Sequence, residues 1–259
     1  ALVKAFSELT AKAHPIWVKA RESNDFKLFS PTLSQIIDYN QQMAQAWGYT
    51  QSPYDALLDV YEPGLTVAQV EETFNTLKPA LVSLVKTLTQ SQTPLDTRFL
   101  SRRCGMQAQK RWSTFIIETM GFNFKAGRLD LAAHPFCMGL GPGDVRLTTR
   151  FLKTDWLSGM FSSMHEAGHG LYEQGINPAF SRTPLADGAS LGIHESQSRL
   201  WENIIGRSHA FWRYFFPLLK KRFAFQLQGV SFDRFYKAIN RCQPSFIRVE
   251  ADEVTYNLH

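Results

Sequence analysis

The chain has 259 residues, of which 44% are hydrophobic and 20% are charged, and its formal net charge is +5 at pH 7. Such a composition can bury a substantial core, as in an ordinary globular protein. No run of eighteen apolar residues occurs, so we expect neither a membrane-spanning helix nor a membrane partner.

Helical patterns dominate the first 120 residues. Apolar residues recur at helical spacing, and Gly48 is placed to end the second of these segments. Pro79 can introduce a kink into the fourth. Helices are expected over residues 2–22, 32–47, 53–60, 66–90 and 96–120.

The pattern changes between residues 121 and 151, where glycines become frequent. Val145–Phe151 alternates apolar and polar residues, as a strand with one buried face does. The glycines and Pro142 supply the turns that short strands need. This stretch therefore predicts a small antiparallel sheet.

Helices are expected again over residues 155–174, 187–208, 210–226, 231–242 and from 246 onward. No internal repeat, low-complexity tract or linker separates them. The sequence predicts a mainly α fold: one large helical domain over residues 1–259, with a small antiparallel β-sheet beside the helix at 155–174.

The positive net charge does not by itself indicate a nucleic-acid partner. The basic residues between Arg98 and Arg111 fall on the predicted helix 96–120, where charge on the outer face is ordinarily solvated. No nucleic-acid motif accompanies them. We expect no nucleic acid to bind.

The segment His165–His169 reads His-Glu-Ala-Gly-His and predicts a metal centre. On a helix, His165 and His169 point the same way, about 40° apart around the axis, so that one Zn²⁺ can bind both rings. Glu166 then lies close enough to take a proton from an attacking water. Two core histidines are the alternative, but a shared face with a glutamate between them favours the metal.

A catalytic zinc usually has three protein ligands, so a third should come from another element. Glu195 is the best candidate, on a predicted helix that starts near Asp187 or Ala189. Glu202 and His194 are rivals on sequence alone, and Glu195 could instead pair with Arg199 one helical turn on.

Five ordered sequence blocks resemble those of the carboxypeptidase Taq family of zinc-dependent metallocarboxypeptidases. The blocks are His134–Phe136 (HPF), Asp144–Thr148 (DxRxT), His165–His169 (HExxH), His194–Gln197 (HESQ) and Ile247–Asp252 (IRxxAD). The resemblance implies that Glu195 is the third zinc ligand, that Glu166 is the general base and that Arg248 meets the free carboxylate of the substrate.

One block of that family, GxxQDxHW, has no match in the chain. Together with a last segment that stops without a helix cap, this indicates a chain truncated at both ends and similar to the central half of a family member.

The predicted sheet could bind substrate. An edge strand near the metal can pair with an extended peptide through main-chain hydrogen bonds, which predicts broad specificity. His134 and Arg146 are candidates for substrate contact, although Asp144 and Arg146 could equally form an internal salt bridge. Arg248 suits a bidentate grip on a terminal carboxylate, with an ion pair to Glu250 or Asp252 as its alternative.

The expected function is therefore that of a zinc-dependent metallocarboxypeptidase that releases C-terminal amino acids from peptides, with Zn²⁺, or alternatively Co²⁺, as the metal. An oligopeptidase or endopeptidase, or a metal-binding but catalytically incomplete fragment, would carry the same motif. The resemblance implies a homodimer for the intact protein. Three widely spaced cysteines and the lack of a signal-peptide pattern predict a cytoplasmic protein with reduced thiols.

Overall fold

The computed structural model of the chain describes residues 1–91, 95–244, 252 and 254–258. Contacts divide the chain into two compact units, Ala1–Asn75 and Thr76–His259, and each is described by itself. Whether the units form the single domain expected from the sequence stays a prediction. Within the described residues, no helix is long and apolar enough to cross a membrane.

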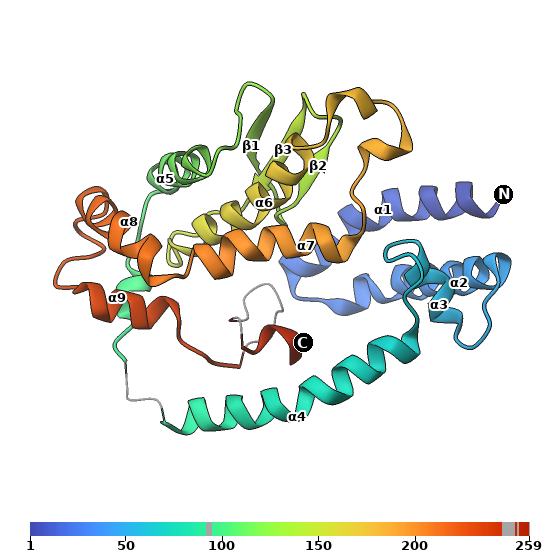
Figure 1. Cartoon of the computed structure of the whole chain (residues 1–259), viewed down its shortest axis with the longest axis horizontal. Helices are drawn as coiled ribbons and strands as arrows, with labels where there is room; N and C mark the ends of the chain where they lie inside the picture. Colours follow the sequence, from blue (N-terminus) through green and yellow to red (C-terminus); the bar gives the residue numbers. More distant parts are fainter. Residues whose placement is uncertain (92–94, 245–251, 253, 259) are drawn as a thin grey trace. The chain divides into compact units, whose positions relative to one another are not determined.

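The first unit is helical (Figure 1). Its helices start where local hydrogen bonding permits: at the beginning of α3, the Ser52 hydroxyl accepts from the Tyr54 N–H while the Asp55 carboxylate accepts from the Ser52 N–H. The helices are α1 (Leu2–Ser23), α2 (Ser30–Trp47), α3 (Pro53–Asp59) and the first part of α4 (Val67–Ser91). They agree closely with the expected ranges, and α4 continues through Pro79.

The second unit contains the remaining helices and a small sheet (Figure 1). Its strands are β1 (Gly127–Leu131), β2 (Cys137–Gly139) and β3 (Val145–Thr149). Its α-helices are the last part of α4, α5 (Met106–Thr119), α6 (Ser158–Gln174), α7 (Leu191–Arg199), α8 (His209–Arg222) and α9 (Phe232–Ile239). The mainly helical fold with a small sheet is confirmed.

The sheet is mixed, which corrects the expectation of an antiparallel one. The strand order is β1-β3-β2, with β2 antiparallel to β3 but β1 parallel to it. Short glycine-rich turns predict hairpins, in which successive strands are antiparallel. β1 and β3 are neighbours in the sheet but not in sequence, and the crossover connection between them allows parallel pairing. The strand expected at 145–151 is confirmed as β3.

Helix α6 packs against this sheet and buries apolar side chains there. Val145 and Leu147 of β3 are fully buried and join Leu129, Ile117 and Ala167 in one core cluster. A larger cluster centres on Trp212 and other aromatic side chains of α5, α6, α8 and α9. Burial of these residues supplies the main stabilising free energy, at about 25 cal/mol per Å² of apolar surface, and it fixes α6 between the two clusters.

Several expected helices are shorter than predicted, including α8 and α9, and the segments 96–120 and 187–208 also change helix type. The segment 96–120 forms a 3₁₀ turn at Arg98–Ser101 before α5 begins, and between the two the Cys104 N–H donates to the Lys153 carbonyl and not to a helical partner. The segment 187–208 starts later, at α7, where the Ser190 hydroxyl caps the helix, and it widens into a π-helix at Leu200–Ile205. The helix expected from 246 onward falls largely outside the described residues, and its end is a 3₁₀ turn at Tyr256–Leu258.

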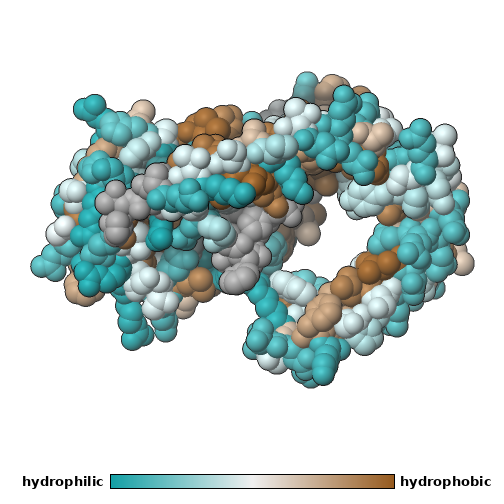
Figure 2. Space-filling model, turned by 90° about the horizontal axis from the view of Figure 1, so that it is seen from below, coloured by the Kyte–Doolittle hydropathy of each residue, from teal (hydrophilic) through white to brown (hydrophobic). Residues whose placement is uncertain are grey.

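Large apolar side chains are also exposed on the surface. Hydrophobic residues form several separate patches among hydrophilic ones on the face shown in Figure 2. The most exposed examples come from different elements and loops: Val3, Leu185, Tyr214, Phe225 and Phe26. Singly exposed apolar residues are normal on protein surfaces and need no functional explanation.

Candidate metal centre

Helix α6 places His165 and His169 on the same face. The two rings lie with their centroids 4.9 Å apart, and both side chains are mostly buried. The helix ends at Gln174, as the expected range 155–174 predicts, whereas its start falls at Ser158, a little later than expected. The four-residue spacing therefore brings two imidazoles to one point in space.

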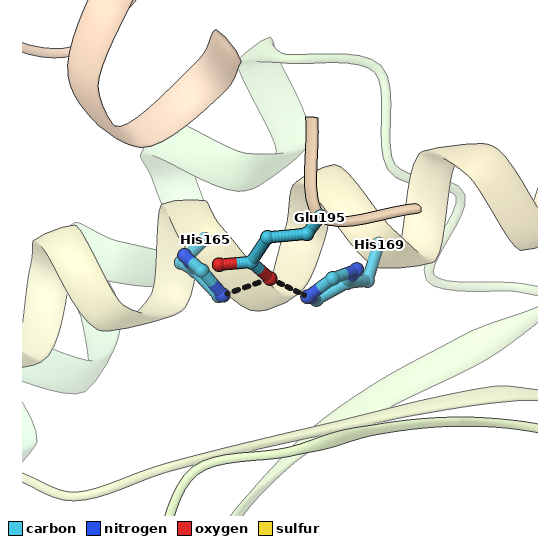
Figure 3. A group of neighbouring side chains, drawn as sticks. All are labelled: His165, His169 and Glu195. Carbon is cyan, nitrogen blue, oxygen red and sulfur yellow. Dashed lines mark ion pairs between the residues drawn. The ribbon is translucent and has the colours of Figure 1, made fainter. Parts of the chain in front are cut away.

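Helix α7 brings Glu195 to the same point. Its Oε2 atom lies 3.5 Å from His165 Nε2 and 3.4 Å from His169 Nε2 (Figure 3). Gly168 makes this approach possible, because a Cβ atom there would lie 2.6 Å from the Cα of Ser198 and 2.8 Å from the Gln197 carbonyl oxygen. The absence of a side chain at Gly168 lets α7 lie directly on α6.

The donor set fits a metal ion. Zinc binds imidazole nitrogen and carboxylate oxygen at about 2.0–2.2 Å, so tetrahedral ligand atoms lie about 3.3 Å apart. The spacing of Glu195 from each imidazole is close to that value, and the ligand atoms of all three residues lie within 4.8 Å of one another. Among the described residues, this is the one group of three that can hold a metal in this way.

Glu166 is buried beside these residues, with 7% of its surface exposed. Burial raises the pKa of Glu166 to about 7; the positive charge of His165 opposes this rise, and the charges of Glu195 and Glu202 add to it. A carboxylate with this pKa can both accept and return a proton near neutral pH. The carboxylate that the sequence places in the motif therefore has the acid–base property that proton transfer requires.

The charges of His165 and Glu195 are coupled. Burial lowers the pKa of His165, but hydrogen bonds with Glu195 and Glu202 outweigh it and raise the pKa to about 10. Burial raises the pKa of Glu195, but hydrogen bonds from the two imidazoles and Tyr256 hold it far below its ordinary value. A metal must therefore displace a proton from His165, which makes its affinity rise with pH.

Glu202, a rival for the third ligand, lies behind His165. Its Oε2 atom is 2.9 Å from His165 Nδ1, and the Arg199 guanidinium pairs with the same carboxylate at 3.5 Å. A carboxylate on the second nitrogen of a ligating histidine fixes the ring and its tautomer. The geometry places Glu202 on the Nδ1 atom of His165, and Glu195 beside the Nε2 atoms of both histidines.

His194, the other rival, lies behind His169. Its Nδ1 atom is 2.6 Å from His169 Nδ1, and its Nε2 atom is 2.8 Å from Glu173 Oε1. One ring nitrogen of His194 therefore faces the Nδ1 side of His169, and the other faces Glu173.

Sequence reasoning missed Tyr256 and Ser198. The Tyr256 hydroxyl donates to Glu195 Oε1 at 2.8 Å. The Ser198 hydroxyl donates to the main-chain carbonyl of Glu195 at 2.7 Å and lies 3.2 Å from Glu195 Oε2. The Arg199 guanidinium lies 3.7 Å from the centre of the Tyr256 ring. Ser198 is one turn from Glu195 and could have been found from helical spacing, whereas Tyr256, which lies far along the chain, carries no such signal.

The structure describes two of the three candidate substrate-binding residues. Arg146 is half exposed and forms a two-point ion pair with Asp144, at 2.8 and 3.0 Å, which is the salt bridge considered as its alternative role. His134 lies exposed between β1 and β2. Arg248 lies outside the described residues. Their contact with substrate stays a prediction.

Helix α6 carries two histidines four residues apart and an adjacent buried glutamate, and the next α-helix supplies a carboxylate. This combination is typical of metallopeptidases of the HExxH class. The comparison with known families is more specific. The chain matches the family described as Carboxypeptidase Taq (M32) metallopeptidase over residues 1–259, and it belongs to that family.

The relatives agree with this assignment. Carboxypeptidase 1 of Bacillus subtilis is 45% identical over 256 residues, which covers 99% of this chain and 51% of the relative. Thermostable carboxypeptidase 1 of Thermus thermophilus is 41% identical and is covered to 52%. The chain therefore spans about half the length of the curated relatives it matches.

Solved structures give the same result for the fold. The BsuCP crystal structure has a TM-score of 0.97 at 45% sequence identity, with 100% of this chain and 52% of that chain covered. The M32 carboxypeptidase from Deinococcus radiodurans R1 has a TM-score of 0.88 at 41% identity, with the same coverage.

Proposed function

We propose that the protein acts as a zinc-dependent metallocarboxypeptidase, which releases C-terminal amino acids from peptides with broad specificity. The observation that carries this proposal is the meeting of Glu195 Oε2 with the Nε2 atoms of His165 and His169, beside the buried carboxylate of Glu166. Relatives named carboxypeptidase support the same activity.

His165, His169 and Glu195 would hold the metal. When bound, Zn²⁺ supplies a Lewis acid that lowers the pKa of water and polarises a carbonyl group. Glu166 takes the proton of the attacking water on its carboxylate and returns it to the leaving amine. Its raised pKa, about 7, suits both transfers. The family membership supports a metal in general, and Zn²⁺, with Co²⁺ as the alternative ion, is part of the proposal.

Strand β2 offers a place for the peptide. It lies at an edge of the described sheet and packs against α6, which carries the two histidines. Main-chain hydrogen bonds to such an edge do not depend on the side chains of the peptide, so broad specificity follows. In this proposal Arg248 grips the terminal carboxylate, and His134 and Arg146 contact the substrate. A homodimer and a cytoplasmic location remain expectations for the intact protein.

Metal content and exopeptidase activity test the proposal together. We expect one zinc per chain and chelator-sensitive release of the C-terminal residue from a blocked dipeptide, but no cleavage of the same peptide with an amidated C-terminus. Glu166→Gln should keep the zinc and lose activity by about 10²–10⁴-fold, as expected for loss of a general base. The measurement is made on this chain and on a longer form of the protein that contains it.

Other outcomes would contradict parts of the proposal. Cleavage of the amidated dipeptide would show that a free C-terminal carboxylate is not required, and it would favour an endopeptidase. Zinc without release in this chain, but with release in the longer form, would mean that the active site needs residues beyond these. Absence of bound metal from both forms would overturn the metal centre.

A further inference from the structure

We propose that Glu173 and His194 form a hydrogen-bonded relay that orients His169 at the metal centre, so that both act as positioning residues. This inference rests on the proposed metal site, and it adds two residues to it. Glu173 and His169 lie one turn apart on α6, whereas His194 comes from α7, directly before Glu195.

The relay consists of two short contacts in series. His169 Nδ1 lies 2.6 Å from His194 Nδ1, and His194 Nε2 lies 2.8 Å from Glu173 Oε1. All three side chains are mostly buried, with 16–17% of their surface exposed. Contacts of this length with little competing water are strong hydrogen bonds.

The chemistry of imidazole permits one direction along the relay. A neutral imidazole has one N–H donor and one lone-pair acceptor. If His169 Nε2 binds the metal, its Nδ1 atom must carry the hydrogen and donate it to His194 Nδ1. His194 then carries its own hydrogen on Nε2 and donates it to the Glu173 carboxylate. The carboxylate therefore determines the tautomer of His169 through the intervening ring.

Neighbouring residues pack closely around Glu173 and His194. A Cβ atom on Gly139 of β2 would lie 2.3 Å from Glu173 Oε2, so the glycine leaves room for the carboxylate. The Tyr172 ring lies 4.7 Å from the His194 ring, centre to centre. Glu173 and His194 are thus held in place by packing as well as by hydrogen bonds.

The two proposed histidine ligands are supported in parallel. His165 meets the Glu202 carboxylate directly at 2.9 Å, whereas His169 reaches the Glu173 carboxylate through His194. Because His194 and Glu195 are neighbours on α7, the helix that brings the third ligand also holds the relay. A shift of α7 would therefore disturb both.

Zinc affinity tests the relay, measured by competition with a chelator. Glu173→Leu and His194→Phe should each weaken zinc binding about 10–100-fold, as loss of a partner behind a metal ligand does. The double variant should bind no more weakly than His194→Phe alone, because both changes break the same relay. The absorption spectrum of the Co²⁺-loaded protein should change in each variant, since the orientation of one ligand changes.

Matched variants separate orientation from mere packing. Glu173→Gln keeps an oxygen that can accept from His194, so its affinity should lie closer to wild type than that of Glu173→Leu. Gly139→Ala should weaken binding by crowding Glu173 from β2. Glu118→Leu, which removes an exposed carboxylate of α5, should leave zinc affinity unchanged. Circular dichroism without metal establishes that each variant is folded.

Three results would overturn the inference. They are unchanged zinc affinity in folded Glu173→Leu, an affinity for Glu173→Gln as low as that for Glu173→Leu, and additive losses in the double variant. If the wild-type protein binds zinc neither as this chain nor in the longer form, the metal centre is wrong and the relay with it, so the two failures are distinguishable.

Discussion

Two regions of the second unit contain closely paired opposite charges but differ in burial. On the solvent face of the sheet, Arg128 pairs with Asp130 and Arg146 pairs with Asp144, and these side chains are 42–64% exposed. Between α6 and α7, His165 pairs with Glu195 and Glu202, and these side chains are only 9–35% exposed. The Arg146–Asp144 and His165–Glu202 contacts have similar lengths, 2.8 and 2.9 Å, but different consequences.

The difference is one of solvent screening. Exposed ion pairs interact through water, and most contribute little to stability. Charges between packed helices interact more strongly, and a partner lost there leaves an uncompensated charge. Burial beside the histidines on α6 therefore raises the pKa of Glu166 to about 7, whereas the charges on the sheet face are screened by water.

The largest expected effect comes from adding a side chain at Gly168, where α6 and α7 are in contact. Gly168→Ala places a Cβ atom against the backbone of Ser198, which must move. Overpacking of this kind costs about 1–3 kcal/mol of stability, and displacement of Glu195 should also weaken zinc binding. Thermal unfolding and chelator competition measure the two effects. Gly143→Ala is the matched control, since a Cβ there meets nothing within 4 Å.

Wild-type stability and zinc affinity in Gly168→Ala would contradict this prediction. They would mean that α7 does not lie against α6 at Gly168, and that this contact does not position Glu195 beside the two imidazoles.

Replacement of the half-buried carboxylate of Asp252 should have an intermediate effect on stability. Burial raises the pKa of Asp252, but N–H donors from Gln243, Thr255 and Val254 and the Thr255 hydroxyl outweigh it, so the pKa is lowered from 3.8. Because the folded-state pKa is the lower one, the stabilisation is present above about pH 4 and is lost as pH falls through the folded-state value. Asp252→Asn should therefore lower the midpoint of thermal unfolding most at neutral pH.

The sign of that pH dependence is the test. The difference in unfolding midpoint between wild type and Asp252→Asn should shrink as the pH falls from 7 towards 3. A difference that grows in acid would show that the hydrogen bonds do not favour the ionised form of Asp252.

The smallest expected effect is at Arg146. Arg146→Ala removes an exposed ion pair with Asp144, and the thermal unfolding midpoint should not change measurably. If Arg146 contacts the substrate, KM should rise in the same variant. A clear loss of stability would contradict the contrast between the two regions, whereas unchanged stability and unchanged KM would remove Arg146 from the substrate-binding residues.

The sequence predicted those features that depend on local spacing. The helix α6, the shared face of His165 and His169, and most helix ranges follow from periodicity and capping. The break near Cys104 and the parallel pairing of β1 depend on contacts with distant segments, which periodicity does not report. Sequence alone made Glu195 the best candidate but left Glu202 and His194 as rivals, and the resemblance to a known family selected Glu195.

Residues behind the proposed ligands were harder to predict. Glu173 lies one turn beyond His169, yet a glutamate on a helix is ordinarily solvated, and its meeting with His194 depends on how α7 packs against α6. Tyr256 reaches Glu195 from a distant turn. Such contacts are set by tertiary packing and leave no motif of their own.

The most direct test of the proposed metal centre is the X-ray absorption spectrum of the zinc-loaded protein. The arrangement of His165, His169 and Glu195 predicts two imidazole ligands and otherwise oxygen, all at about 2.0–2.2 Å. A zinc–sulfur distance near about 2.3 Å would require Cys104, Cys137 or Cys242, and three imidazoles with no carboxylate oxygen would put a further histidine, such as His194, in the place of Glu195. Either result would contradict the assignment of Glu195 as the third ligand.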